Sequence, residues 1–230
     1  VGTRYGLLVS TNDGRTFALS TATGIPSTEG MISFAGARQN GSNRFFCVTW
    51  NRSSIYSGIL GYELGAYCGV YRLDEGASLW ARTTNGIGGC WVSFVGMASN
   101  NTSVAYLAGT TGGADYPAVF KTVNGGAAWT SVFQFNNNKN IYTGWRGHTT
   151  DPNAWQQWWW GTYPLGFAVC ASDPNRAMVT DLGFVHLTTN GAATWSQSYV
   201  NPQDQNPTNA PSLAGKDYHS SGLENTACWS

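Results

Sequence analysis

With 230 residues, 42% hydrophobic and 14% aromatic, the chain can bury a substantial core, which excludes a disordered protein. Only 10% of the residues are charged, and twelve basic side chains balance twelve acidic ones. This composition indicates neither a nucleic-acid-binding surface nor a polybasic membrane-binding surface. The apolar runs are too short to span a bilayer, so no membrane insertion is expected.

Alternating apolar residues bounded by turn residues predict β-strands along most of the chain. Residues 6–10 and 16–20 are predicted to be the last two strands of a sheet. Three complete four-stranded sheets are expected to follow, and residues 223–230 are predicted to begin another. Their strands are expected at 31–38, 44–51, 67–73 and 79–83, then at 91–98, 104–109, 118–123 and 128–133, and finally at 165–171, 177–181, 184–188 and 194–200.

Three of the intervening turns repeat one pattern, at residues 10–17, 122–129 and 188–195. Each begins with Ser or Thr, has Asn two residues later and Gly or Ala at the fifth position, and ends with an aromatic residue. A weaker copy runs from residue 72 to 80. Asn side chains bond to the backbone that follows them, and Gly readily takes a positive φ. We expect the aromatic ring to fold back over its own turn and to fasten the hairpin before neighbouring sheets meet.

This pattern resembles the Asp-box (BNR) repeat of sialidases, family-74 glycoside hydrolases and sortilin-type receptors. It departs from the usual repeat because Asn stands where Asp is commonest and Ala192 replaces the Gly. The resemblance implies an all-β fold, a β-propeller of four-stranded antiparallel blades. We expect residues 1–230 to be a single propeller region with about four blades, an incomplete arc of a larger propeller. Its blade parts are 1–21, 31–84, 90–133, 164–200 and the start of another at 223–230.

An open arc leaves bare blade edges, which need a partner. Pairing residues 6–20 with 223–230 would close a small ring within the chain. Missing blades in a longer precursor or in another chain would cover the edges instead. An oligomer or filament in which another copy of the chain does so is the third alternative.

Propeller topology sends the short turns to one rim and the long loops to the other. The long loops span residues 52–66, 110–117, 134–164 and 201–222, and connections of such length are often functional. Loop 134–164 is rich in aromatic rings that suit the apolar faces of sugars, so a polysaccharide or another glycan is the predicted partner. The rings could instead pack the loop onto its scaffold or fill an interface. Candidate substrate-binding residues are Trp145, Trp155, Trp158, Trp160, Tyr163 and, in the last loop, His219.

Hydrolysis of a glycoside needs two carboxyl groups across a cleft. Asp181 with Asp151 or Asp217 is the predicted catalytic pair, although Asp181 could simply cap its turn. A sialidase would need three arginines and a Tyr–Glu pair, and this rim offers only Arg52 and Arg146. The sequence contains no metal-ligand spacing and no cofactor motif, so neither a metal nor a cofactor is expected. A non-enzymatic extracellular scaffold, adhesin or fibre subunit is the alternative function.

Low charge, many aromatic residues and the family resemblance together predict a secreted, extracellular protein. Cys47 and Cys68 lie in neighbouring predicted strands, so they are candidates for a disulfide bond, with buried free thiols as an equal alternative. Glycosylation sequons are present at Asn40, Asn51, Asn100 and Asn101.

Overall fold

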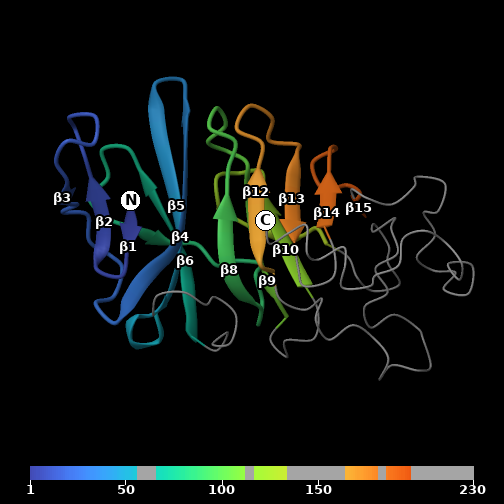
Figure 1. Ribbon diagram of the computed structural model, residues 1–230, viewed down its shortest axis with the longest axis horizontal. Coiled ribbons are helices and arrows are strands. Elements are labelled where there is room, and N and C mark those ends of the chain that lie inside the picture. Colours follow the sequence, from blue (N-terminus) through green and yellow to red (C-terminus); the bar gives the residue numbers. More distant parts are fainter. Residues whose placement is uncertain (56–65, 112–116, 134–163, 181–184, 198–230) are drawn as a thin grey trace, which may run out of the picture.

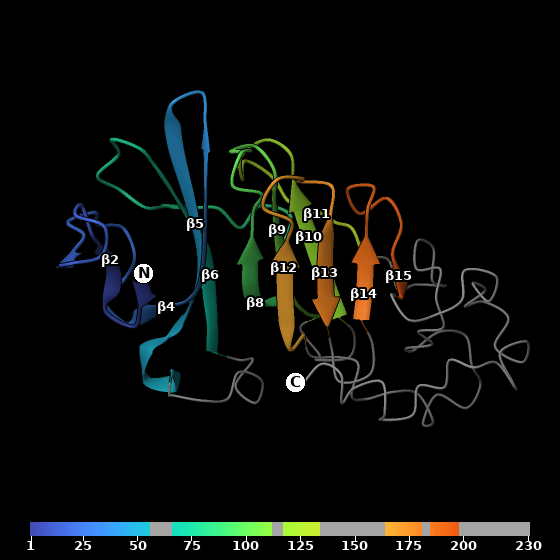
Figure 2. The same cartoon turned by 45° about the horizontal axis from the view of Figure 1, so that its top comes forward.

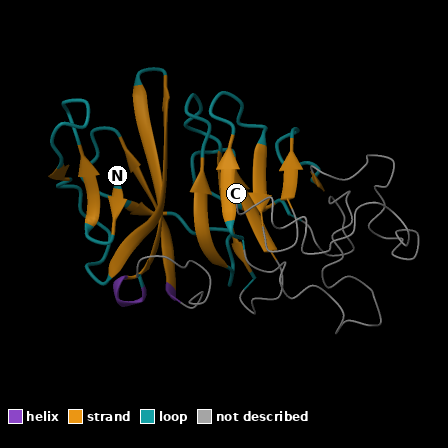
Figure 3. Cartoon of the chain, in the orientation of Figure 1, coloured by secondary structure: helices purple, strands orange, loops and turns teal. Residues whose placement is uncertain are grey.

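The computed structural model describes residues 1–55, 66–111, 117–133, 164–180 and 185–197. These residues form four antiparallel β-sheets that stand side by side in an open arc, with the first sheet at one end and the fourth at the other (Figure 1). Helical structure among them is confined to short 3-10 turns such as η1 (Arg52–Ser54) (Figure 3). The predicted all-β class is confirmed.

Each sheet is a meander in which strands adjacent in the sequence pair with each other. The first sheet contains β1 (Gly2–Thr3), β2 (Gly6–Val9) and β3 (Ala18–Leu19), so it has one strand more than predicted. Each strand predicted between residues 6 and 200 has a counterpart. The second sheet contains β4 (Glu29–Gln39), β5 (Ser42–Asn51), β6 (Tyr67–Asp74) and β7 (Ala81–Arg82); the third contains β8 (Trp91–Gly96), β9 (Ala105–Thr110), β10 (Pro117–Thr122) and β11 (Thr130–Ser131); the fourth contains β12 (Gly166–Val169), β13 (Ala177–Thr180), β14 (Val185–Thr188) and β15 (Ser196–Gln197).

The antiparallel register separates two rims (Figure 2). Gln39 pairs with Ser42 at one end of the second sheet, and Glu29 pairs with Asn51 at the other. The β4–β5 turn and the three repeated turns lie on the first rim, which we call the turn rim. The strand ends that flank the long connections, Asn51 and Tyr67 among them, lie on the opposite rim, which we call the loop rim.

The three repeated turns share one hydrogen-bond network. In the third sheet, Thr122 Oγ1 donates to Asn124 Oδ1 at 2.8 Å and accepts from the N–H of Gly126 at 2.9 Å. Asn124 Oδ1 also accepts from the N–H of Ala128 at 3.0 Å. The same three bonds recur around Asn12 and around Asn190. Asn therefore closes the turn as the sequence predicts, with the hydroxyl group and the amide oxygen satisfying the backbone.

In the third and fourth sheets the aromatic residue that ends the repeat packs against the preceding sheet, so the expectation that it folds over its own turn is wrong for these two copies. Trp129 Nε1 donates to the carbonyl oxygen of Thr83, directly after β7, at 3.0 Å. Trp195 Nε1 donates in the same way to Val132, directly after β11, at 2.9 Å. Both side chains are buried. The burial of these two rings therefore depends on the preceding sheet, and each ring holds two consecutive sheets together.

The weaker copy in the second sheet builds a different turn. Arg72 stands where the other copies have a hydroxyl residue, and the Asp74 carboxylate pairs with Arg44 at 2.5 Å and with Arg72 at 3.3 Å. Its aromatic residue is nevertheless used as in the other sheets. Trp80 is buried, and its main-chain N–H donates to the carbonyl oxygen of Thr23, beyond the last strand of the first sheet.

The core lies between the sheets, where each pair of neighbours encloses a cluster of apolar side chains. Cys47 and Cys68 are both free thiols in this core region, so the candidate disulfide is not formed. Their strands, β5 and β6, are neighbours as expected, but Cys47 pairs with Tyr71 in the register. Cys68 therefore lies three residues away along β6, out of reach of a disulfide bond.

Candidate functional site

The residues predicted from the sequence to bind substrate or to catalyse lie outside the described residues. The predicted carboxylate pair and the predicted aromatic contacts therefore stay predictions. They are Asp151, Asp181 and Asp217 for catalysis, and Trp145, Trp155, Trp158, Trp160, Tyr163 and His219 for binding.

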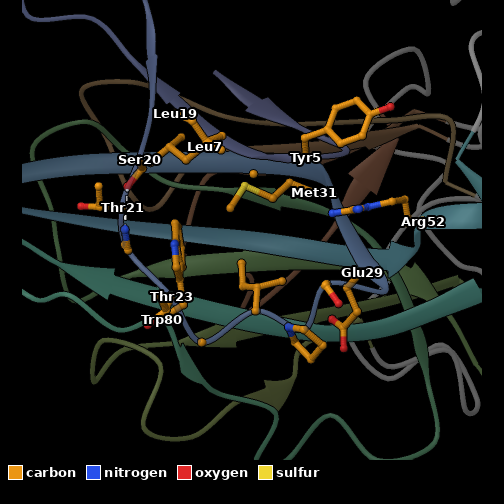
Figure 4. A pocket seen from close by; sticks show the side chains of 16 residues that line it. Tyr5, Leu7, Leu19, Ser20, Thr21, Thr23, Glu29, Met31, Arg52 and Trp80 are labelled. Carbon is orange, nitrogen blue, oxygen red and sulfur yellow. Dashed lines mark hydrogen bonds between the residues drawn. The ribbon is translucent and has the colours of Figure 1, made fainter.

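The described part of the loop rim offers a cavity of about 310 Å³ between the first and second sheets. Figure 4 shows Tyr5, Arg52 and Glu29 gathered at one end of it. Leu7, Met31 and other apolar side chains continue the wall toward the interior. An apolar cavity with a few polar groups at its mouth is the usual form of a small-ligand site.

Tyr5 is the exposed aromatic residue of this site. It lies in the turn between β1 and β2, where Thr3 Oγ1 donates to the carbonyl oxygen of Gly6 at 2.7 Å and accepts from the N–H of Tyr5 at 3.1 Å. The ring is 64% exposed. The guanidinium carbons of Arg4 and Arg52 lie 5.3 Å and 5.2 Å from its centroid, within the range of cation–π attraction. The Tyr5 ring and the Arg52 guanidinium thus line the cavity together, with Arg4 beside the ring.

Arg52 is held in place by the start of η1. Its main-chain N–H donates to the carbonyl oxygen of Thr28 at 2.7 Å, and the Asn51 side chain accepts from the N–H of Ser53 at 3.1 Å. The Nε atom of Arg52 is buried and has no hydrogen-bond partner among the residues that the structure describes. A buried donor without a partner costs stability, and a ligand acceptor would recover it. Arg52 is therefore the clearest candidate for a ligand-binding side chain among the described residues.

Tyr67 gives a second unpartnered polar atom on the same rim. Its register partner is Trp50, its ring packs against the core between the second and third sheets, and its hydroxyl group is buried without a hydrogen-bond partner among the described residues. Burial raises the pKa of Tyr67 to about 12, with the positive charge of Arg82 opposing the shift. The phenol therefore stays protonated at neutral pH and can act as a donor.

Glu29 is the single carboxylate on the loop rim among the described residues. It accepts hydrogen bonds from Thr49 Oγ1 at 2.5 Å and from Tyr71 Oη at 3.2 Å. Tyr71 is only 3% exposed, and burial together with the negative charge of Glu29 raises its pKa. A protonated, enclosed phenol cannot attack a substrate, so this Tyr–Glu pair is structural. The other described carboxylates lie at turns of the turn rim: Asp13, Asp74, Glu75 and Asp173.

The sequence pointed to one member of this site. Arg52 was noted as an arginine of the loop rim, whereas Tyr5 was not, because strand β1 was not predicted and its turn was not recognised. Tyr67 begins a predicted strand, whereas Glu29 lies two residues before one, because β4 starts earlier than predicted. Only the pairing register, which places Glu29 opposite Asn51 and Tyr67 opposite Trp50, could have brought both to the loop rim.

Three further features concern ligands, the membrane and glycosylation. The described residues contain no group of three or more His, Cys, Asp or Glu side chains that could hold a metal ion. None of their helices is long and apolar enough to cross a membrane. Asn40, Asn51 and Asn100 are exposed; the Asn51 oxygen accepts from Ser53, the Asn100 amide donates to Ser172, and the Asn101 oxygen accepts two backbone N–H groups. Glycosylation of the four stays a prediction.

Comparison with known proteins identifies the fold. The sequence matches no family model and no curated protein. The structure is similar to a GH74 xyloglucanase from Xanthomonas campestris, with a TM-score of 0.55, 15% identity and 87% of this chain covered. It is also similar to a GH74 enzyme from Niastella koreensis, with a TM-score of 0.52, 17% identity and 82% of this chain covered. An ancestral GH74 enzyme gives a TM-score of 0.51, 18% identity and 86% coverage.

These likenesses show the fold, a β-propeller arc, and confirm the resemblance inferred from the repeated turns. This chain spans 26%, 26% and 22% of the three GH74 chains. It therefore corresponds to about a quarter of the length of the proteins it resembles.

Proposed function

We propose that this chain is part of a secreted carbohydrate-active propeller that binds a neutral polysaccharide on its loop rim. The observation that carries the proposal is the unpartnered Arg52 Nε, which lies beside the exposed Tyr5 ring at the mouth of a 310 Å³ cavity. A sugar ring can stack on Tyr5 while its hydroxyl groups accept from the guanidinium of Arg52. The predicted aromatic side chains of loop 134–164 would extend the same rim.

Binding should be measured by calorimetry, with soluble xyloglucan as the first ligand because a structural neighbour is a xyloglucanase. Tyr5→Ala and Arg52→Gln are each expected to weaken binding about tenfold, which corresponds to the loss of one hydrogen bond or one ring contact. Val123→Ala is the matched control, because Val123 is 66% exposed beside a turn of the turn rim.

If no glycan binds at millimolar concentration, the proposal fails and the scaffold function takes its place. If xyloglucan binds but both variants bind as wild type does, the cavity is not the site. Loss of xyloglucan binding should then be tested in alanine variants of the predicted binding residues Trp145, Trp155, Trp158, Trp160 and Tyr163.

Hydrolysis is the second step of the proposal and rests on the predicted carboxylates. Combining Asp181→Asn with Asp151→Asn or Asp217→Asn is expected to abolish reducing-sugar release and to leave xyloglucan binding intact. Glu29 cannot replace them, because both of its oxygens bond to Thr49 and Tyr71. Wild-type protein that binds xyloglucan without releasing reducing sugar would be a binding module.

One observation favours the non-enzymatic alternative, a scaffold or fibre subunit that makes protein–protein contacts. Two large apolar side chains on the first sheet, Phe17 and Leu19, are more than half exposed. A surface of this kind is typical of a contact with another protein.

A further inference from the structure

The outward face of the first sheet is built like a sheet junction but has no neighbouring sheet among the described residues. In the repeated turns, Phe17 occupies the position of Trp129 and Trp195. Those two rings are 3% and 1% exposed because each packs against the sheet before its own. Among the described residues no sheet packs against Phe17, which is 51% exposed.

The neighbouring side chains extend this apolar face. Leu7 packs with Met31 in the cluster between the first and second sheets. Because side chains alternate along a strand, Leu8 points away from the second sheet. Its cross-strand partner Leu19 lies on the edge strand β3, where it lines the cavity between the first and second sheets and also the outer hollow beside Phe17. Leu19 is 55% exposed, where the equivalent position of the third sheet carries Ser131. A hollow of about 370 Å³ lies beside Phe17 and Leu19.

The fourth sheet has the complementary face, which no other sheet covers within the described part of the chain. Phe167 and Val179 pack toward the third sheet, so the residues that alternate with them point outward. Ala168, Met178 and Leu187 pair across β12, β13 and β14 and form an apolar row on that outward face. Met178 is 38% exposed. The equivalent face of the third sheet, with Ala108 and Val119, is buried by the fourth sheet.

We propose that the outward face of the first sheet binds the outward face of the fourth sheet of a second copy of this chain. The internal junctions specify the occupant, because each consists of an apolar sheet face that covers the aromatic residue of the next sheet. The first and fourth sheets of one copy lie at opposite ends of the arc, so they cannot meet each other (Figure 1). Phe17 lacks the ring N–H of the tryptophans, so the contact is apolar. The proposal goes beyond glycan binding and does not depend on it.

Such a contact joins two different surfaces, so it propagates from copy to copy until a ring closes or a filament grows. This geometry permits a complementation test with the full chain. The first variant, Phe17→Asp with Leu19→Asp, blocks the first-sheet face. The second variant, Met178→Asp, blocks the fourth-sheet face. Sedimentation velocity over a range of concentrations measures association, and thermal unfolding checks that both variants are folded.

Wild-type protein is expected to associate, and each variant alone to be monomeric with a dissociation constant raised at least about 30-fold. An equimolar mixture of the two variants should form a one-to-one dimer and stop there, because only one open face remains on each copy. Val123→Asp, which charges an exposed valine outside both faces, should associate like wild type.

Wild-type protein that stays monomeric at high concentration would overturn the proposal, since a segment of the same chain would then cover Phe17. A mixture that stays monomeric, or a Val123→Asp variant that also loses association, would overturn it too. If both blocking variants still associated on their own, the apolar contacts would be unselective, and the proposal would be overturned.

Discussion

The first and third sheets contain the same turn in two different environments. Around Asn12 and around Asn124 the hydroxyl group, the amide oxygen and the backbone N–H groups make the same hydrogen bonds. The aromatic residues that follow differ, because Phe17 is half exposed whereas Trp129 is buried against the second sheet. The comparison shows that the turn is encoded locally. Burial of its aromatic residue depends on the sheet next to it.

The largest expected difference is in the free energy of unfolding when Trp129 and Phe17 are each replaced by alanine. Trp129→Ala should lower the free energy of unfolding by about 3–5 kcal/mol, because it leaves a cavity beside Phe46 and removes the hydrogen bond to Thr83. Phe17→Ala should cost less than about 1 kcal/mol, since half of its ring is already in water. Urea unfolding of dilute protein, where copies are apart, measures both. Equal losses would mean that Phe17 is covered within one copy.

The glycines of the two turns should give the next largest difference. Gly14 and Gly126 have φ angles of 81° and 87°, and Ala192 holds the same position in the fourth sheet at 68°. An alanine is therefore tolerated by this turn at the usual strain, about 1–2 kcal/mol. At Gly126, a Cβ would also lie 2.6 Å from the buried ring of Phe46, whereas at Gly14 the nearest atom is 3.9 Å away.

We therefore expect Gly14→Ala to lower stability by about 1–2 kcal/mol, and Gly126→Ala by about 2–4 kcal/mol because the Phe46 ring must shift. Urea unfolding midpoints at constant m-value compare the two variants directly. A Gly14→Ala variant as damaging as Gly126→Ala would place an unseen neighbour against the first turn.

The hydroxyl residues that begin the turns should differ less. Thr122 is buried and accepts from the N–H of Gly126, so Thr122→Val leaves that donor without a partner and should cost about 1–3 kcal/mol. Ser10 makes the same bond in a solvent-accessible turn, where water can replace it, so Ser10→Ala should cost at most about 1 kcal/mol. Thermal unfolding of the two variants provides the measurement. The reverse order would contradict the view that burial, and not the turn itself, sets the cost.

Much of the arc could be predicted because its strands and turns are specified by residues close together in the sequence. Alternating apolar residues identified the strands, and the spacing of Ser or Thr, Asn and Gly identified the turns before any contact between sheets was known. Strand β1 was missed because two residues, Gly2 and Thr3, are too short a segment to show alternation. The role of Trp129 was predicted wrongly because its partner, Thr83, lies 46 residues earlier in the chain.

The candidate site could be predicted less well than the fold. The sequence identified the loop rim correctly, since the order of short and long connections follows from a meander. It did not identify the cavity, because Tyr5, Glu29 and Arg52 come together only through the packing of the first sheet on the second. A sequence cannot show that a donor such as Arg52 Nε lacks a hydrogen-bond partner in the described part of the chain, because every arginine has the same donors.

The smallest expected effect concerns the reactivity of the cysteine thiols, which also differs between buried and exposed positions. Cys170 is exposed on the turn rim, and hydrogen bonds from the main chain and side chain of Ser172 lower the pKa of its thiol. Burial raises the pKa of Cys47, and burial also raises that of Cys68, with the charge of Glu29 adding to both shifts. A lower pKa gives more thiolate at a given pH, and the thiolate is the nucleophile.

Of the four described cysteines, iodoacetamide should therefore label Cys170 first, and its labelling rate should reach a plateau at lower pH than that of an ordinary cysteine. Cys47 should stay unlabelled until the protein is unfolded, because neither solvent nor base reaches its thiol. Peptide mass spectrometry after timed labelling measures the order. Unfolding without a reductant supplies the control, in which Cys47 and Cys68 should both become labelled. If both stayed unlabelled there, the bond between them would exist, and the register that pairs Cys47 with Tyr71 would have to shift.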